Sequence, residues 1–139
     1  MKKKILLGAI VLLAVICTVV FLLGKGGKTS DVERIISITS GVYTEAQITD
    51  AMEVVENHFR KNFDDCSLLR LEYDEGKTLS ERYHLSEDYG VERVIVLESD
   101  YYVGNHAEGC FTPDYTYKNW KWILTDEGDG WVLRTSGYG

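Results

Sequence analysis

The chain has 139 residues, of which 45% are hydrophobic and 27% charged, with one proline and 13 glycines. This ordinary globular mixture excludes collagen-like, low-complexity and wholly disordered chains, and its length is enough for one domain. Charge is divided unevenly. Residues 1–30 carry five lysines and no acidic residue, whereas residues 31–139 carry ten basic and 22 acidic residues. The acidic excess argues against nucleic acid as a partner, because binding to phosphates needs a basic face.

Residues 5–23 form an apolar run that follows a short basic stub, residues 1–4. As a helix this run would be about 28 Å long, enough to cross the hydrocarbon core of a bilayer. The competing interpretation is a cleaved signal peptide, but Leu22, Leu23 and Gly24 match a small-x-small cleavage site poorly. We therefore expect an uncleaved single-pass anchor. Its flanking lysines place the stub in the cytoplasm and the rest of the chain outside the cell membrane.

Residues 24–43 are expected to connect this anchor to the folded domain. The stretch from Gly24 to Ser30 has no apolar side chain to bury, so it predicts a flexible linker spanning on the order of 15 Å. Residues 31–43 contain several isoleucines and valines without a clear period, which indicates an extended lead-in or edge strand. The acidic domain, residues 44–139, is expected to sit close to the membrane without lying on anionic headgroups.

The first helix of the domain is marked by a capping box, in which Thr44 and Gln47 exchange hydrogen bonds with each other's backbone amides. Apolar residues then recur at helical spacing as far as Phe59, and the helix is expected to end near Asn62. The residues of this stripe are Ile48, Ala51, Met52, Val55 and Phe59.

Strands are predicted where apolar and polar residues alternate, at residues 69–73, 91–103, 117–125 and 131–135. Asp74 to Lys77 are expected to form a turn, and Ser80 to cap a short helix that stops at Gly90. Residues 104–116 are expected to be a loop. One long amphipathic helix and four half-buried strands predict an α+β domain, in which a curled antiparallel sheet packs on the helix.

Four segments of the sequence together resemble an uncharacterised family of short bacterial proteins that are membrane-tethered or secreted. These segments are Tyr43 to Ile48, His58 to Phe63 followed by Cys66, Tyr117 to Trp122, and Trp131. The family is similar in outline to the cystatin-like and NTF2-like α+β group. The resemblance covers residues 43–138 and implies a fold, but no activity and no functional residues.

Glu98 and Asp100 are the candidate acid and base, because residues two apart on a strand project from the same face. The alternative is a solvated outer face, since Ile95, Leu97, Ser99, Tyr101 and Val103 make the better core face. The three histidines have no metal-ligand spacing, so neither a metal nor a cofactor is expected. No nucleophile elbow or phosphate-binding glycine motif is present in the sequence.

Aromatic residues are the candidate lining of an apolar binding pocket. Trp120 and Trp122 share one strand face, Trp131 follows across a turn, and Tyr101 lies on the neighbouring strand. Packing in the core or at an edge is the alternative. Cys66 and Cys110 are the only cysteines outside the apolar run, and outside the cell they are expected to form a disulfide.

The leading hypothesis is thus a single-pass membrane protein that presents a noncatalytic domain for binding a protein, a peptide or an envelope component. One alternative is a scaffold subunit of a secretion or conjugation machine that carries an NTF2-like domain. A second alternative is a small enzyme with a carboxylate in a sheet pocket.

Overall fold

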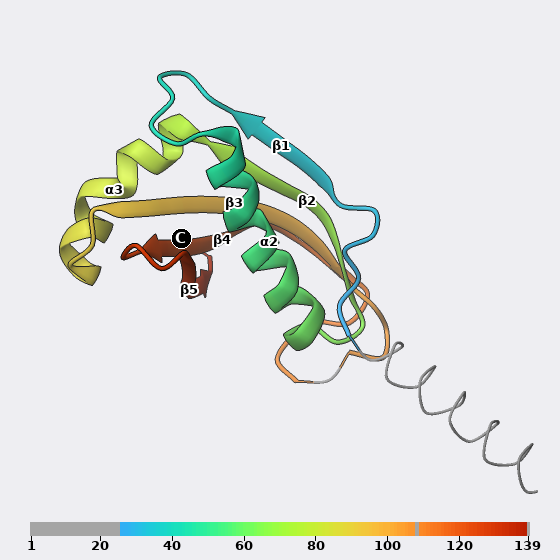
Figure 1. Ribbon diagram of the computed structural model, residues 1–139. Helices are drawn as coiled ribbons and strands as arrows, with labels where there is room; N and C mark the ends of the chain where they lie inside the picture. Colours follow the sequence, from blue (N-terminus) through green and yellow to red (C-terminus); the bar gives the residue numbers. More distant parts are fainter. Residues whose placement is uncertain (1–25, 108, 139) are drawn as a thin grey trace, which may run out of the picture.

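The computed structural model describes residues 26–107 and 109–138, which form an α+β domain of two helices and a five-stranded mixed sheet (Figure 1). The predicted cytoplasmic stub and membrane anchor, residues 1–23, lie outside the described residues. Among the residues that are described, no helix combines the length and the apolar character needed to cross a membrane.

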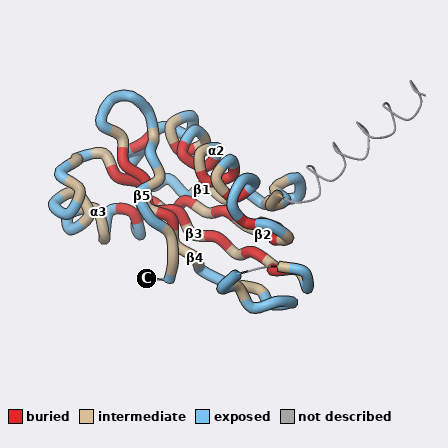
Figure 2. Tube along the Cα trace, turned by 90° about the horizontal axis from the view of Figure 1, so that it is seen from below, coloured by how far each residue is buried: buried red, intermediate tan, exposed pale blue. Residues whose placement is uncertain are grey.

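The long helix, α2, spans Glu45–Asn62, as the capping box predicts. Thr44 Oγ1 accepts from the Gln47 amide at 3.2 Å, and Gln47 Oε1 accepts from the Thr44 amide at 2.9 Å. All five residues of the predicted apolar stripe are fully buried. This face of α2 packs against the inner face of the sheet (Figure 2).

Four strands run antiparallel in chain order: β2 (Cys66–Asp74), β3 (Arg93–Val103), β4 (Tyr115–Asp126) and β5 (Trp131–Gly137). The predicted core face of β3, from Ile95 to Val103 in steps of two, is buried throughout. Leu71 on β2 and Trp122 on β4 are fully buried beside it. Period-2 patterning thus identified the inner face of these strands correctly.

The fifth strand, β1 (Glu33–Ser37), is the predicted edge strand, but it pairs parallel to β2. The sheet is therefore mixed, and the expectation of a purely antiparallel sheet is wrong. The reason is connectivity, because α2 carries the chain from the end of β1 back to the start of β2, and a helical crossover joins parallel strands. Arg34 of β1 is fixed to Glu56 of α2 by an ion pair of 2.6 Å.

A β-bulge changes the predicted orientation of Leu69. The register of β2 against β3 shifts between Leu68 and Arg70. Leu68 is consequently buried, and Leu69 is 44% exposed on the outer face. The extra residue of a bulge breaks the period of two, which simple alternation cannot anticipate.

The second helix, α3, spans Glu75–Tyr89 and begins five residues before the predicted cap at Ser80. Asp74 is the N-cap, since its Oδ1 accepts from the Lys77 amide at 3.1 Å. The predicted turn at residues 74–77 is therefore the first turn of the helix. Aspartate is favoured in a turn and at an N-cap for the same reason, its short side-chain acceptor. Gly90 ends the helix at φ +66°, as expected.

The predicted flexible linker is already part of the fold from residue 26 onward. The Gly27 amide donates to the Arg60 carbonyl at 3.0 Å, and Lys28 exchanges backbone hydrogen bonds with Cys66 and Leu68. Glycine allows this approach, because a Cβ on Gly27 would lie 2.4 Å from the carbonyl oxygen of Phe59. The absence of side chains here permits close backbone contact, and the prediction of free rotation is wrong for these residues.

Candidate functional site

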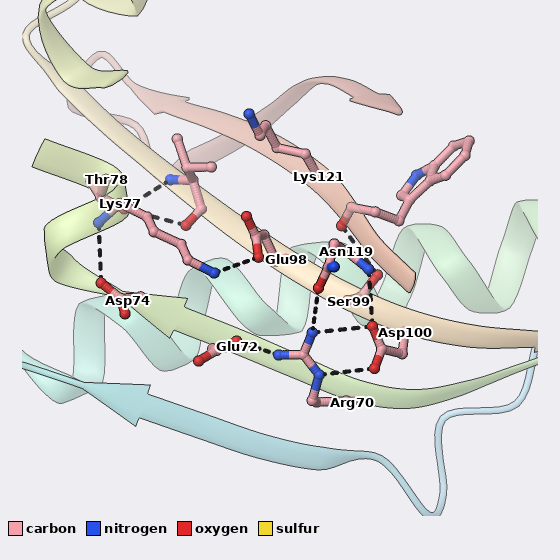
Figure 3. Close-up of polar contacts among 12 residues, drawn as sticks. Arg70, Glu72, Asp74, Lys77, Thr78, Glu98, Ser99, Asp100, Asn119 and Lys121 are labelled. Atoms are coloured by element: carbon pink, nitrogen blue, oxygen red, sulfur yellow. Dashed lines mark hydrogen bonds and ion pairs between the residues drawn. The ribbon is translucent and has the colours of Figure 1, made fainter. Parts of the chain in front are cut away.

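The candidate acid and base, Glu98 and Asp100, lie together on the outer face of β3, on the side away from α2 (Figure 3). Each carboxylate is held by a cation. Lys77 Nζ lies 2.7 Å from Glu98 Oε2, and Arg70 contacts both oxygens of Asp100 at 3.1 Å. The prediction that residues two apart on a strand share a face is therefore correct for Glu98 and Asp100. On that face both carboxylates form ion pairs.

Arg70 connects the charges of this outer face. Besides Asp100 it donates to Glu72 on its own strand and to Asn119 Oδ1 at 3.2 Å. The Asn119 amide in turn donates to Asp100 Oδ1 at 3.0 Å. The hydrogen bond from Arg70 is the main cause that lowers the pKa of Asp100 below its ordinary value.

This arrangement is unsuited to general acid catalysis by Asp100. A general acid needs a raised pKa, whereas ion pairing and hydrogen bonding favour the ionised carboxylate. Both carboxylates are also only partly exposed, at 16% for the Glu98 side chain and 21% for that of Asp100. We conclude that the outer charges connect β2, β3, β4 and α3 to one another.

The four aromatic residues predicted to line a pocket separate into two groups. Tyr101 and Trp120 come together, with ring centroids 5.5 Å apart. Trp122 is buried in the core beside His58 and Phe63. Trp131 packs 5.4 Å from Tyr43, beside the first residues of β3. The described side chains therefore do not form one site from all four residues.

Tyr101 and Trp120 instead belong to a larger aromatic cluster beyond the last turn of α2. Tyr101 is fully buried at its centre, stacked on Tyr117 at 5.1 Å. Phe111, Tyr117 and Trp120 pack around Tyr101 toward solvent, and Tyr115 and Tyr138 pack against Tyr117. We call these five rings the aromatic surface. Tyr115 and Tyr138 are 49% and 61% exposed, so the core extends here without a break to an open face.

Two buried polar atoms in this cluster have no hydrogen-bond partner, the hydroxyl oxygen of Tyr101 and Nε1 of Trp120. Burial also raises the pKa of Tyr101 far above its ordinary value. Buried Tyr and Trp side chains usually find a partner for their polar atoms.

Sequence reasoning missed Phe111, Tyr115 and Tyr138. Phe111 and Tyr115 both lie in residues 104–116, which were expected to be a loop, and Tyr138 follows the last strand. A usable signal was the density of aromatic residues between 111 and 120, a segment that contains four of them. Phe111 stacks on Phe63 at 5.2 Å, which holds the loop against the end of α2.

A groove of about 380 Å³ lies on the outer face at the same end of the sheet. Exposed Leu69, Tyr102 of β3 and Thr116 of β4 line it, together with Lys28 from the first described segment. Tyr102 donates a hydrogen bond to Asp114, which ties β3 to the end of the loop.

The predicted disulfide is absent from the structure, because Cys66 and Cys110 are both free thiols. Cys66 is buried below the end of α2, and its thiol lies 3.5 Å from the Asp64 carbonyl oxygen. Burial raises the pKa of this thiol to about 11. Cys110 is exposed in the loop. An even number of cysteines did not bring the two thiols together.

Metal ligands do not converge in residues 26–107 and 109–138, where no group of three His, Cys, Asp or Glu side chains could hold an ion. His58 instead packs between Phe63 and Trp122. Desolvation there lowers the pKa of His58 below its ordinary value, so its neutral form is favoured.

Comparison with known proteins finds no family model, no curated protein and no solved structure that matches this chain.

Proposed function

We propose that this chain is a single-pass membrane protein that holds a small noncatalytic binding domain outside the cell. Residues 5–23 are the anchor, and residues 26–138 contain the domain. The proposal of an anchor rests on the apolar run and on the lysines that precede it.

The ion-paired outer face supports a role without catalysis. Glu98 and Asp100 are each held by a cation, and the pKa of Asp100 is lowered. The alternative of a small enzyme required a carboxylate in an apolar pocket. Glu75 is buried, but its two carboxylate oxygens accept hydrogen bonds from Thr39, Ser40 and Val42, which leaves it committed to the fold.

The aromatic surface is the observation that carries the binding role. It combines exposed Tyr115 and Tyr138 with unpaired donors on Tyr101 and Trp120 directly behind them. Exposed aromatic clusters in soluble domains mark binding surfaces, because Tyr and Trp offer a large apolar area together with a polar tip.

Location and binding can be tested separately with the full chain. Protease added to intact producing cells should digest the domain and leave an anchored fragment, and complete protection would refute the external location. For binding, the chain in detergent micelles is titrated with soluble peptidoglycan fragments, a peptide library and lipid vesicles. Tyr117→Ala should weaken the binding observed, whereas Tyr83→Ala, at a residue 68% exposed on α3, should not. Equal effects of the two variants would exclude the aromatic surface as the site.

A further inference from the structure

The point at which the chain enters the fold is fixed by the backbone contacts of Gly27 and Lys28. Between the last residue of the apolar run, Leu23, and the first described residue, Gly26, there are only Gly24 and Lys25. Three residue steps span at most about 11 Å, even when fully extended. If residues 5–23 cross a bilayer, the end of the domain that holds Gly26 is kept at the bilayer surface.

That end of the sheet also carries the aromatic surface. Lys28 pairs with the start of β2, and the Gly104 amide, just after β3, donates to the Asp65 carbonyl at 2.8 Å. Val103 is the register partner of Tyr115, the first residue of β4. Figure 1 shows the first described residues and the described parts of the loop, residues 104–107 and 109–114, at this one end. We call it the entry end.

Charge is distributed so that the entry end is nearly balanced. Its described residues include three basic ones, Lys28, Arg60 and Lys61, and four acidic ones, Asp31, Asp64, Asp65 and Asp114. The opposite end, where α3 ends, β3 starts and β4 turns into β5, has a clearer acidic excess. Six acidic residues there, Glu87, Asp88, Glu92, Asp126, Glu127 and Asp129, outnumber three arginines, Arg82, Arg93 and Arg134, two of which form ion pairs with Asp126 and Glu127. An anionic bilayer would repel that far end and tolerate the entry end.

We propose that the partner of the aromatic surface is the lipid bilayer that anchors the chain, so that the entry end rests on its interface. This inference rests on the proposed function, because only a membrane-spanning anchor brings the entry end to the lipid. Exposed Tyr115 and Tyr138 then lie at the depth of the headgroups, and exposed Leu69 lies in the groove on the outer face of the same end.

The chemistry of the surface fits this partner. Tyr and Trp are enriched where a bilayer meets water, because their rings prefer the apolar side and their polar atoms the hydrated side. Ester carbonyls and phosphates of the interface are acceptors for the hydroxyl groups of exposed Tyr115 and Tyr138. The sequence predicts that the acidic domain as a whole is kept off anionic headgroups, and the proposal departs from this expectation only at the entry end, where charge is nearly balanced.

Cys110 provides a native reporter, because it is exposed in the entry-end loop. The full chain carrying Cys17→Ser is labelled at Cys110 with an environment-sensitive fluorophore and reconstituted in phosphatidylcholine vesicles that contain a headgroup spin label. The matched control carries Cys17→Ser, Cys110→Ser and Asp129→Cys, which moves the label to the opposite end. Carbonate extraction of the same vesicles reports whether the chain spans the bilayer.

Three results are possible, and they separate the two proposals. If the chain resists extraction and the fluorophore is quenched more strongly at position 110 than at position 129, both the anchor and the lipid contact are supported. A chain that resists extraction but is quenched equally at both positions, or at neither, overturns the lipid contact and leaves the anchor intact. A chain that carbonate releases overturns the anchor and, with it, the lipid contact.

A second variant tests whether the aromatic side chains make the contact. Tyr115→Ser combined with Tyr138→Ser should reduce the quenching at position 110, while the chain still resists extraction. Val132→Ser, which changes a residue 48% exposed on β5, is the control and should leave the quenching unchanged. If the fluorophore at position 110 is quenched equally in the parent chain, in the double tyrosine variant and in the Val132→Ser variant, the aromatic surface does not face the lipid.

Discussion

The hydroxyl of Tyr43 forms hydrogen bonds with both backbone groups of Val94, in the place of a neighbouring strand. It accepts from the Val94 amide and donates to the Val94 carbonyl, both at 3.0 Å. The hydroxyl of Thr78 makes the same pair of contacts with Val96, at 3.3 Å each. Pairing between β2 and β3 extends only to Tyr73 and Leu97, so these two hydroxyls satisfy backbone groups that β2 no longer reaches.

Tyr43→Phe should therefore destabilise the domain although it removes a single oxygen. The ring can still fill its buried position, but the Val94 amide and carbonyl lose their partner. Leaving buried backbone groups unpaired should lower the free energy of unfolding by about 1–3 kcal/mol. Urea denaturation of the full chain measures this, with Tyr83→Phe on exposed α3 as the control. Equal midpoints for the two variants would show that water replaces the hydroxyl.

Glu75 should make the domain sensitive to acid. Hydrogen bonds from the Thr39 side chain and from the amides of Ser40, Val42 and Thr39 hold the pKa of its buried carboxyl far below the ordinary value. A pKa that is lower in the folded state stabilises the fold fully above the ordinary glutamate pKa of about 4.3. This stabilisation is lost progressively as the pH falls below that value.

Glu75→Gln tests this dependence. At pH 7 its urea midpoint should be lower than that of wild type, because an amide nitrogen replaces one accepting oxygen among the donors of residues 39–42. Between about pH 5 and pH 2 the midpoint of the variant should fall less steeply than that of wild type. Glu87→Gln on exposed α3 should keep the wild-type midpoint at pH 7. Parallel curves for Glu75→Gln and wild type would contradict this account of Glu75.

Gly27→Ala should detach the first described segment from the domain. The added Cβ would lie 2.4 Å from the Phe59 carbonyl oxygen and 2.7 Å from the Phe59 ring, both held by the helix. Such overpacking costs about 1–3 kcal/mol. Hydrogen exchange at the Leu68 amide, which donates to Lys28 at 2.8 Å, should accelerate. Ser30→Ala, at an exposed position, is the control and should leave exchange at the Leu68 amide slow. If exchange at this amide is also unchanged in Gly27→Ala, the first described segment is not docked on the domain.

The two thiols should react at very different rates in the native protein. In the full chain with Cys17→Ser, an alkylating agent at neutral pH should modify exposed Cys110 and spare Cys66, which is buried and has a pKa of about 11. Unfolding in urea without reductant should then expose Cys66 to a second alkylation. Mass spectrometry counts the adducts. Absence of any adduct in urea would reinstate the disulfide.

Local patterns in the sequence determined the main elements and the inner face of the sheet. The capping box set the start of α2 at Glu45, and helical spacing identified its buried stripe through Phe59. Alternation identified the inner residues of β3, and Gly90 marked the end of α3. These features depend on side chains a few residues apart, so the sequence alone contains their cause.

Only the tertiary structure decided which distant residues meet. The crossover through α2 made β1 parallel to β2, and the bulge after Leu68 exposed Leu69. Close packing against Phe59 fixed the backbone of Gly27, although the composition of the segment from Gly24 to Ser30 had predicted a flexible linker. Tyr101 and Trp120 joined the aromatic surface while Trp131 joined Tyr43, because strand register places them at different ends of the sheet. Register and loop docking arise from contacts far apart in the chain, which no local period contains.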